Sequence, residues 1–279
     1  MTRSNFIQTK KTATLSKVHK SSSIKDEVKE TIAEETPIAL IYNGISHVVM
    51  MGSPSDLEDF ATGFSVTEGI VDDLSDIYSI EINYKRNGIE LNIKISSECF
   101  IRLKEVRRNL IGRTGCGLCG AESLSQAMRI PKVNISNSHF HSKNILEALK
   151  NFSKDQYLQK DTGATHASAI FAAEGNLKII REDVGRHVAL DKLIGASLKQ
   201  KKYEDDFVIT SSRASYEMVQ KIAYLNLKLL VAISAPTGLA IRIADNLGIT
   251  LIGFAREARY TIYSPVSYTH LTLPTTRCG

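Results

Sequence analysis

The stretch FVITSSRASYEMVQKIAYLNLKLLVAISAPTGLAIRIADNLGITLIGF, residues 207–254, decides the fold of this chain. It alternates short apolar, β-branched runs with longer segments of helical periodicity. Strands are expected at Phe207–Thr210, Leu229–Ser234 and Thr250–Phe254, and helices at Arg213–Leu225 and Thr237–Leu247. Strands that alternate with helices of this length predict right-handed crossovers and a parallel sheet covered on both faces.

The segments before this stretch extend the same domain. A hairpin is expected at Ala167–Ala172 and Leu177–Arg181, followed by a helix at Val184–Leu198. An amphipathic helix at Lys143–Gln159 precedes them, after a polar connection that begins at Pro131. We therefore predict a C-terminal α/β domain over residues 131–265.

The N-terminal half has a different pattern. Two hairpins with Asn-Gly turns are expected at Ile38–Tyr42/Ile45–Met51 and Ile77–Tyr84/Ile89–Ile95, and helices at residues 55–64 and 100–110. These elements predict a small α+β unit over residues 36–130, which ends in a Cys-x-x-Cys loop. Residues 1–35 are charged and polar with little apolar periodicity, so a flexible arm is expected there.

Composition limits the class of protein. The chain has 279 residues and a formal charge of +5, which suits an anionic ligand without indicating a nucleic-acid coat. Membrane spans need roughly 18 consecutive apolar residues, and the sequence has no such run. Its four cysteines form no disulfide framework, so a reducing cytoplasm is expected. Residues 266–279 read as the translation of a sequencing adapter and are excluded from fold reasoning.

The sequence RTGCGLCG, residues 113–120, is the main candidate for chemistry. Its glycines allow positive φ angles, so the sulfurs of Cys116 and Cys119 can be presented on an exposed loop. Arg113 and a helix expected near Glu122 favour the thiolate form by charge and by the helix dipole. A reactive pair of sulfurs is the resulting hypothesis.

Three other interpretations of this loop fit less well. Structural zinc needs four ligands, and neither Cys99 nor Cys278 belongs to a second pair. A thioredoxin-like dithiol follows a strand, whereas a helix is expected before Arg113. The letters G-x-G-x-x-G lack the strand and the later acidic residue of a dinucleotide fingerprint. No metal site is predicted.

The ends of the predicted strands carry polar and basic residues. Ser211 and Arg213 follow the first strand, Ser234 and Thr237 the second, and Phe254–Arg259 the third. Free backbone N–H groups, hydroxyls and guanidinium groups at one sheet edge favour phosphate binding, although the Ser and Thr residues also suit helix caps.

Two histidines of the C-terminal half receive no role from the sequence. His166 begins a strand, His187 begins a helix, and Asp183 is a candidate helix cap. The H-x-E and P-C-x-x-C signature of zinc deaminases is absent, so hydrolysis of a nucleobase is not supported.

Several motifs together resemble the FdhD family. They are Arg113–Cys119, Thr165-His166-Ala167, Glu182–His187, Asp191–Gly195, Arg213–Lys221, Ser234–Thr237 and Leu251–Phe254. The resemblance implies a cytoplasmic, homodimeric sulfurtransferase with a three-layer C-terminal domain similar to cytidine deaminases. It also implies transfer of sulfur from a cysteine desulfurase to the molybdenum bis(guanine dinucleotide) cofactor, the bound substrate, for the catalytic subunit of formate dehydrogenase.

Site residues follow from the resemblance position by position. Cys116 matches the persulfide-bearing cysteine and Cys119 its partner. The cofactor-contacting segment matches Phe254, Ala255, Arg256, Glu257, Ala258 and Arg259. Two rival hypotheses remain: a cofactor-binding insertion chaperone without sulfur transfer, and an enzyme of nucleotide metabolism on the same fold.

Overall fold

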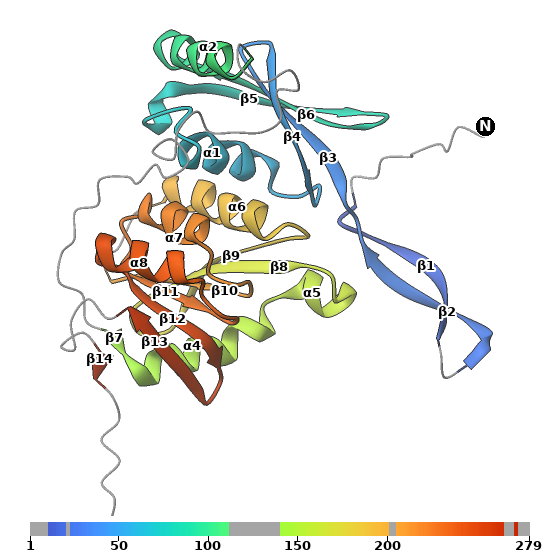
Figure 1. Cartoon of the computed structure of the whole chain (residues 1–279). Coiled ribbons are helices and arrows are strands. Elements are labelled where there is room, and N and C mark those ends of the chain that lie inside the picture. Colours follow the sequence, from blue (N-terminus) through green and yellow to red (C-terminus); the bar gives the residue numbers. More distant parts are fainter. Residues whose placement is uncertain (1–10, 21–22, 112–139, 201–204, 265–270, 273–279) are drawn as a thin grey trace, which may run out of the picture.

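Two β-sheets with helices packed between them form the body of the protein (Figure 1). The computed structural model describes residues 11–20, 23–111, 140–200, 205–264 and 271–272. The smaller sheet has the order β4-β3-β6-β5, with β3 at Thr36–Tyr42, β4 at Ile45–Gly52, β5 at Ile77–Lys85 and β6 at Gly88–Ile95. The larger has the order β13-β12-β11-β10-β8-β9, with β8 at His166–Phe171, β9 at Leu177–Asp183, β10 at Phe207–Thr210, β11 at Leu229–Ala232, β12 at Thr250–Arg256 and β13 at Arg259–Ser264.

The smaller sheet confirms both predicted hairpins. Asn43 and Gly44 have φ angles of 46° and 83°, as a tight hairpin turn requires. The hairpins join through parallel pairing of β3 with β6, in which Leu40 lies opposite Leu91. Alternate residues of β6 are buried in the cluster that helix α1 (Leu57–Thr67) completes. A second helix, α2 (Ser97–Ile111), follows this sheet.

The larger sheet is mixed. Strands β10, β11 and β12 are parallel, as predicted, whereas β8, β9 and β13 run antiparallel to their neighbours. The parallel arrangement predicted for residues 207–254 is therefore confirmed, and antiparallel strands extend the sheet on both sides. Short connections explain the difference, because two strands joined by a tight turn must run antiparallel. Strand β13 was not predicted, because residues 254–259 resembled a strand-to-helix turn.

Helices cover both faces of this sheet, so its architecture is layered as predicted. Helix α4 (Ser142–Lys154) packs on one face, and α6 (Arg186–Leu198), α7 (Tyr216–Ala223) and α8 (Gly238–Leu247) pack on the other. The single helix predicted at residues 143–159 is instead two, because α4 ends before α5 (Tyr157–Thr162) begins. The Gln156 side chain bonds the Phe152 carbonyl at this break.

Both ends of the chain contain strands that the sequence did not predict. Within the expected flexible arm, β1 (Ala13–Lys20) and β2 (Ser23–Ala33) form an antiparallel hairpin. Its strands carry many Lys, Glu and Thr residues, so they lack the apolar alternation of a half-buried strand. Near the other end, β14 (Leu271–Thr272) pairs with β7 (Phe140–His141).

Helices α1 and α6 cross very closely. A Cβ atom added to Gly63 would lie 1.8 Å from the Asp191 carbonyl oxygen, and one added to Gly195 would lie 1.9 Å from that of Asp59. Only glycine permits this approach of the two backbones. The crossing joins the N-terminal unit to the larger sheet.

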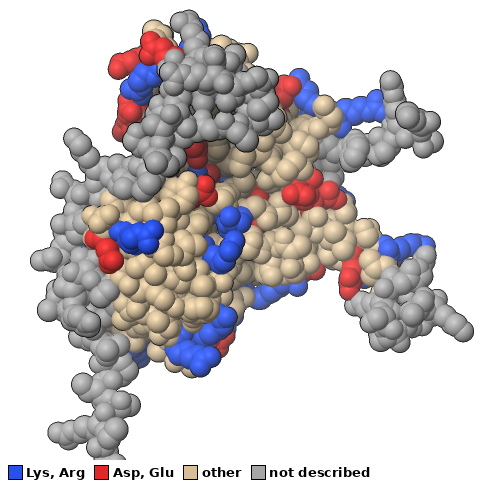
Figure 2. All heavy atoms as spheres, in the orientation of Figure 1, with Lys and Arg blue, Asp and Glu red and all other residues tan. Residues whose placement is uncertain are grey.

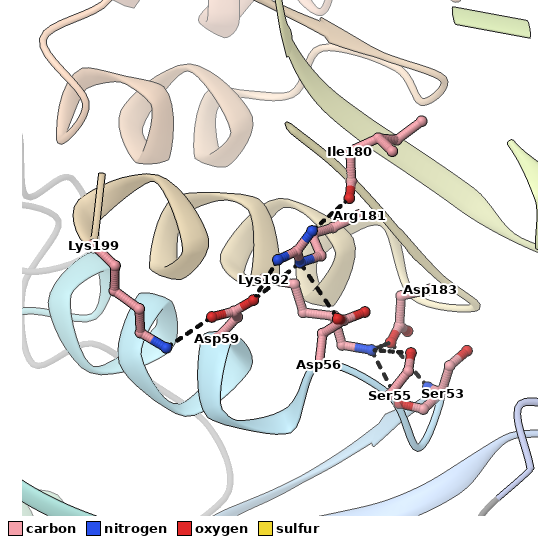
Figure 3. A network of polar contacts seen from close by, with 9 residues as sticks. All are labelled: Ser53, Ser55, Asp56, Asp59, Ile180, Arg181, Asp183, Lys192 and Lys199. Atoms are coloured by element: carbon pink, nitrogen blue, oxygen red, sulfur yellow. Dashed lines mark hydrogen bonds and ion pairs between the residues drawn. The ribbon is translucent and has the colours of Figure 1, made fainter. Parts of the chain in front are cut away.

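Charged side chains reinforce the same contact (Figure 3). Asp59 accepts hydrogen bonds from Arg181 Nη2 at 2.7 Å and from Lys199 Nζ at 2.9 Å. Deeper in, Lys192 Nζ lies 2.6 Å from Asp183 Oδ2 and donates to the Ser53 carbonyl at 3.0 Å. Burial raises the pKa of Asp183, and the Lys192 ammonium opposes that shift.

Candidate functional site

The cysteine pair lies outside the described residues, since Cys116 and Cys119 fall within residues 112–139. The structure describes the helix that leads towards them, α2, and the cysteine at its start. Cys99 is 2% exposed and lies in the first turn of α2. A thiol at that position is inaccessible to a large sulfur donor.

Three side chains with metal-ligating atoms cluster around Cys99. The ligand atoms of Asp72, Asp76 and Cys99 lie within 4.8 Å of one another. The guanidinium of Arg102 already lies 2.6 Å from Asp72 Oδ2 and 3.2 Å from the Cys99 sulfur. A bound cation would have to displace this positive charge, so the group does not fit a metal ion.

Backbone bonds hold the three predicted strand ends together at one edge of the larger sheet. The Ile233 N–H donates to the Thr210 carbonyl at 2.9 Å, and the Phe254 N–H donates to the Ser234 carbonyl at 3.1 Å. Thr237 donates its N–H to the Ala214 carbonyl at 3.0 Å. The predicted clustering of these turns is thus confirmed.

The segment after β10, which carries Ser211 and Arg213, differs in detail from the predicted strand-to-helix turn. Helix α7 begins at Tyr216, so Ser211 and Arg213 lie in a connecting segment and not at the helix N-terminus itself. Ser212 is buried, and its hydroxyl bonds the Arg213 carbonyl at 3.0 Å. The Arg213 side chain is exposed, with no hydrogen bond or ion pair to any described residue.

The segment after β11, which carries Ser234 and Thr237, contains a helix cap. Thr237 is the N-cap residue of α8, and its hydroxyl oxygen accepts from the Ala240 N–H at 3.3 Å. This is the capping role that the sequence left open for it. Ser234 is half-buried, and its carbonyl is used by Phe254.

The third segment, residues 254–259, is a hairpin and not a strand-to-helix turn. Strand β12 runs to Arg256, Glu257 and Ala258 form the exposed turn, and Arg259 begins β13. The pairing register shifts between Gly253 and Arg256, so a bulge interrupts the ladder. Bulges redirect side chains at sheet edges.

Two side chains stand out in this hairpin. Phe254 has a φ angle of 50° and is 49% exposed, so a strained backbone holds an aromatic ring at the surface. The exposed Arg256 donates to the Ile233 and Ala255 carbonyls, which fixes its guanidinium beside the neighbouring turn. Ala255 is fully buried and its carbonyl already accepts from Arg256, so it presents no exposed atom to a ligand.

Two residues missed as site candidates reach the same edge. His166 Nδ1 lies 3.2 Å from Ser211 Oγ, and Arg186 begins helix α6 next to β9. Strand order brings them there. Both residues lie in stretches that resemble the family motifs, Thr165–Ala167 and Glu182–His187, but neither received a role from the sequence. On the face shown in Figure 2, Lys and Arg side chains are separated by wide uncharged areas, so the basic groups do not form a continuous stripe.

Comparison with known proteins identifies the family. The model of the FdhD/NarQ family matches residues 33–269, which include the cysteine pair. The chain belongs to this family. It is 51% identical over 236 residues to the sulfur carrier protein FdhD of Cupriavidus necator, covering 84% of this chain and 82% of that protein. The sulfur carrier protein FdhD of Bordetella petrii is 50% identical over 236 residues, covering 84% and 85%.

A solved structure shares the fold. The crystal structure of a putative formate dehydrogenase accessory protein from Desulfotalea psychrophila superposes with a TM-score of 0.72 at 22% identity, covering 93% of this chain and 98% of that one. No helix among the described residues is long and apolar enough to cross a membrane.

Proposed function

We propose that this protein is a sulfur carrier that accepts sulfur on Cys116 from a cysteine desulfurase and passes it to the molybdenum bis(guanine dinucleotide) substrate of formate dehydrogenase. The observation that carries the proposal is the family match over residues 33–269, a span that contains the only Cys-x-x-Cys pair of the sequence. The about 50% identity to proteins named sulfur carriers supports it.

The sulfur transfer balances without an external oxidant. The Cys116 thiolate attacks the outer sulfur of a donor persulfide, a new S–S bond forms, and the donor cysteine leaves as a thiolate. Attack of the Cys119 thiolate on Cys116 then forms a disulfide and releases the carried sulfur as hydrosulfide. Oxidation of the two cysteines to the disulfide supplies the two electrons that the sulfur gains, and a cellular thiol reduces the disulfide before the next cycle.

The sheet edge is the proposed binding position for a guanine nucleotide end of the substrate. Phe254 offers an exposed ring for stacking against a base. Arg213 and Arg256 carry positive charge suited to phosphate oxygens, and Ser211 lies two residues before Arg213 in the chain. Glu257, Ala258 and Arg259 form the rim of the same hairpin.

The chaperone hypothesis differs in one respect, since it needs the nucleotide site and not the sulfur. The deciding experiment measures formate dehydrogenase activity in cells that lack the native protein and carry either wild type or Cys116→Ala. We expect Cys116→Ala to bind GDP like wild type and yet yield no active dehydrogenase. If that variant restores full activity, the protein acts as a chaperone.

Assembly and location are part of the proposal. We expect a homodimer in the cytoplasm, where thiols stay reduced and where desulfurase and dehydrogenase precursors are available. Sedimentation of the purified chain measures the oligomeric state, and a monomer at micromolar concentration would contradict the dimer.

A further inference from the structure

His166 lies at the sheet edge that carries the nucleotide residues, although it belongs to an antiparallel strand. In the antiparallel ladder of β8 and β9, His166 lies opposite Asp183, the last residue of β9. The next residue, Ala167, donates its N–H to Ser211 Oγ at 3.0 Å and accepts from the Ser211 N–H at 2.9 Å. The start of β8, the end of β9 and the turn after β10 are therefore neighbours.

The contacts of Ser211 favour one tautomer of His166. A hydroxyl group carries one proton, and the Ala167 N–H already occupies one lone pair of Ser211 Oγ. Among the described residues, His166 Nδ1 at 3.2 Å is the acceptor left for that proton. Nδ1 then accepts, and the ring proton lies on Nε2, which has no partner within the described part of the chain.

The surroundings of this imidazole favour an anion. Burial and, to a smaller extent, the charge of Arg186 lower the pKa of His166, while Asp183 opposes the shift. The Asp183 carboxylate is paired with Lys192 at 2.6 Å, whereas the Arg186 side chain has no hydrogen bond or ion pair to any described residue. Helix α6 adds the positive end of its dipole, since its N-cap Gly185 has no capping side chain.

We propose that His166 Nε2–H and the Arg186 guanidinium bind a phosphate group of the guanine nucleotide substrate, at the far end of the sheet edge from Phe254. This inference rests on the proposed function. Strands β8 and β12 are separated by β10 and β11, which places them three strand spacings, roughly 14 Å, apart. A ligand that contacts both His166 and Phe254 must be extended, as a nucleoside diphosphate is.

Titration calorimetry with GDP and with guanosine tests the assignment. In His166→Gln the side-chain amide reaches the position of Nε2 and keeps a donor there, whereas in His166→Asn it reaches only the position of Nδ1. We expect His166→Asn and Arg186→Ala to bind GDP roughly tenfold or more weakly than wild type, and His166→Gln to stay within about threefold. Guanosine, which has no phosphate, should bind all four proteins equally.

Each other outcome identifies which claim fails. If His166→Asn and Arg186→Ala bind GDP as wild type does while Arg256→Ala binds it weakly, the phosphate position is wrong and the proposed nucleotide site stands. If the variants lose guanosine and GDP alike, their effect is structural and the inference is overturned. Wild type that binds no GDP would overturn both this inference and the nucleotide part of the proposed function.

Discussion

A single methyl group at the crossing of α1 and α6 should destabilise the protein. In Gly195→Ala the new Cβ would lie 1.9 Å from the Asp59 carbonyl oxygen, where real Cβ contacts are essentially never below 3.0 Å. The obstacle is backbone, so the two helices must separate. Overpacking costs typically about 1–3 kcal/mol, and we place this case at the upper end. Ala restores about 1 kcal/mol of helix propensity, which leaves a net loss near 2 kcal/mol.

Urea denaturation followed by circular dichroism measures this loss as a lower midpoint at constant slope. The matched control is Gly238→Ala in α8, where the nearest atom to the added Cβ is Arg242 Nη1 at 3.6 Å. We expect the control to be neutral or slightly more stable. Equal stability of the two variants would refute the idea that close backbone contact holds the N-terminal unit to the larger sheet.

Three further predictions concern charge, ligand and the C-terminal tail. Lys192→Ala leaves Asp183 buried without its cation and should lower the free energy of unfolding by about 3–5 kcal/mol at pH 7. Because burial raises the pKa of Asp183, the folded variant takes up its proton more readily than the unfolded chain, so the deficit should shrink as the pH falls towards 5; an equal deficit at both pH values would contradict this. Arg213→Ala and Arg256→Ala should each weaken GDP binding by about 1.5–3 kcal/mol, and calorimetry that finds both unchanged would place the nucleotide elsewhere. Among the described residues, deleting 266–279 removes only the two-residue strand β14 that pairs with β7 and should leave the melting temperature within a few degrees of wild type; a larger fall would show that the tail belongs to the fold.

Local sequence signals predicted most of the elements. The Asn43-Gly44 turn and the β-branched runs around residues 207–254 marked strands because tight turns and apolar alternation are local properties. Residues 254–259 misled the prediction, since Phe254 adopts a positive φ angle that phenylalanine rarely has. The β1–β2 hairpin was missed because its pairing depends on a partner strand more than on apolar pattern.

The arrangement of the candidate site residues was predicted in part. The strand ends with Ser211, Arg213 and Arg256 were found because parallel strands present their carboxyl ends on one edge. His166 was not found, because its position beside Ser211 depends on β8 running antiparallel to β10. That order is set by packing between segments distant in the sequence. Thr237 caps helix α8, which is one of the two roles that the sequence left open for it.

Mass spectrometry of the intact protein after incubation with a cysteine desulfurase and cysteine tests the central claim most directly. Wild type and Cys99→Ala should each gain the mass of one sulfur atom, which a thiol reductant removes, because Cys99 is buried and takes no part. Cys116→Ala should gain none. Labelling of Cys116→Ala to the same extent as wild type would contradict the assignment of the carried sulfur to Cys116.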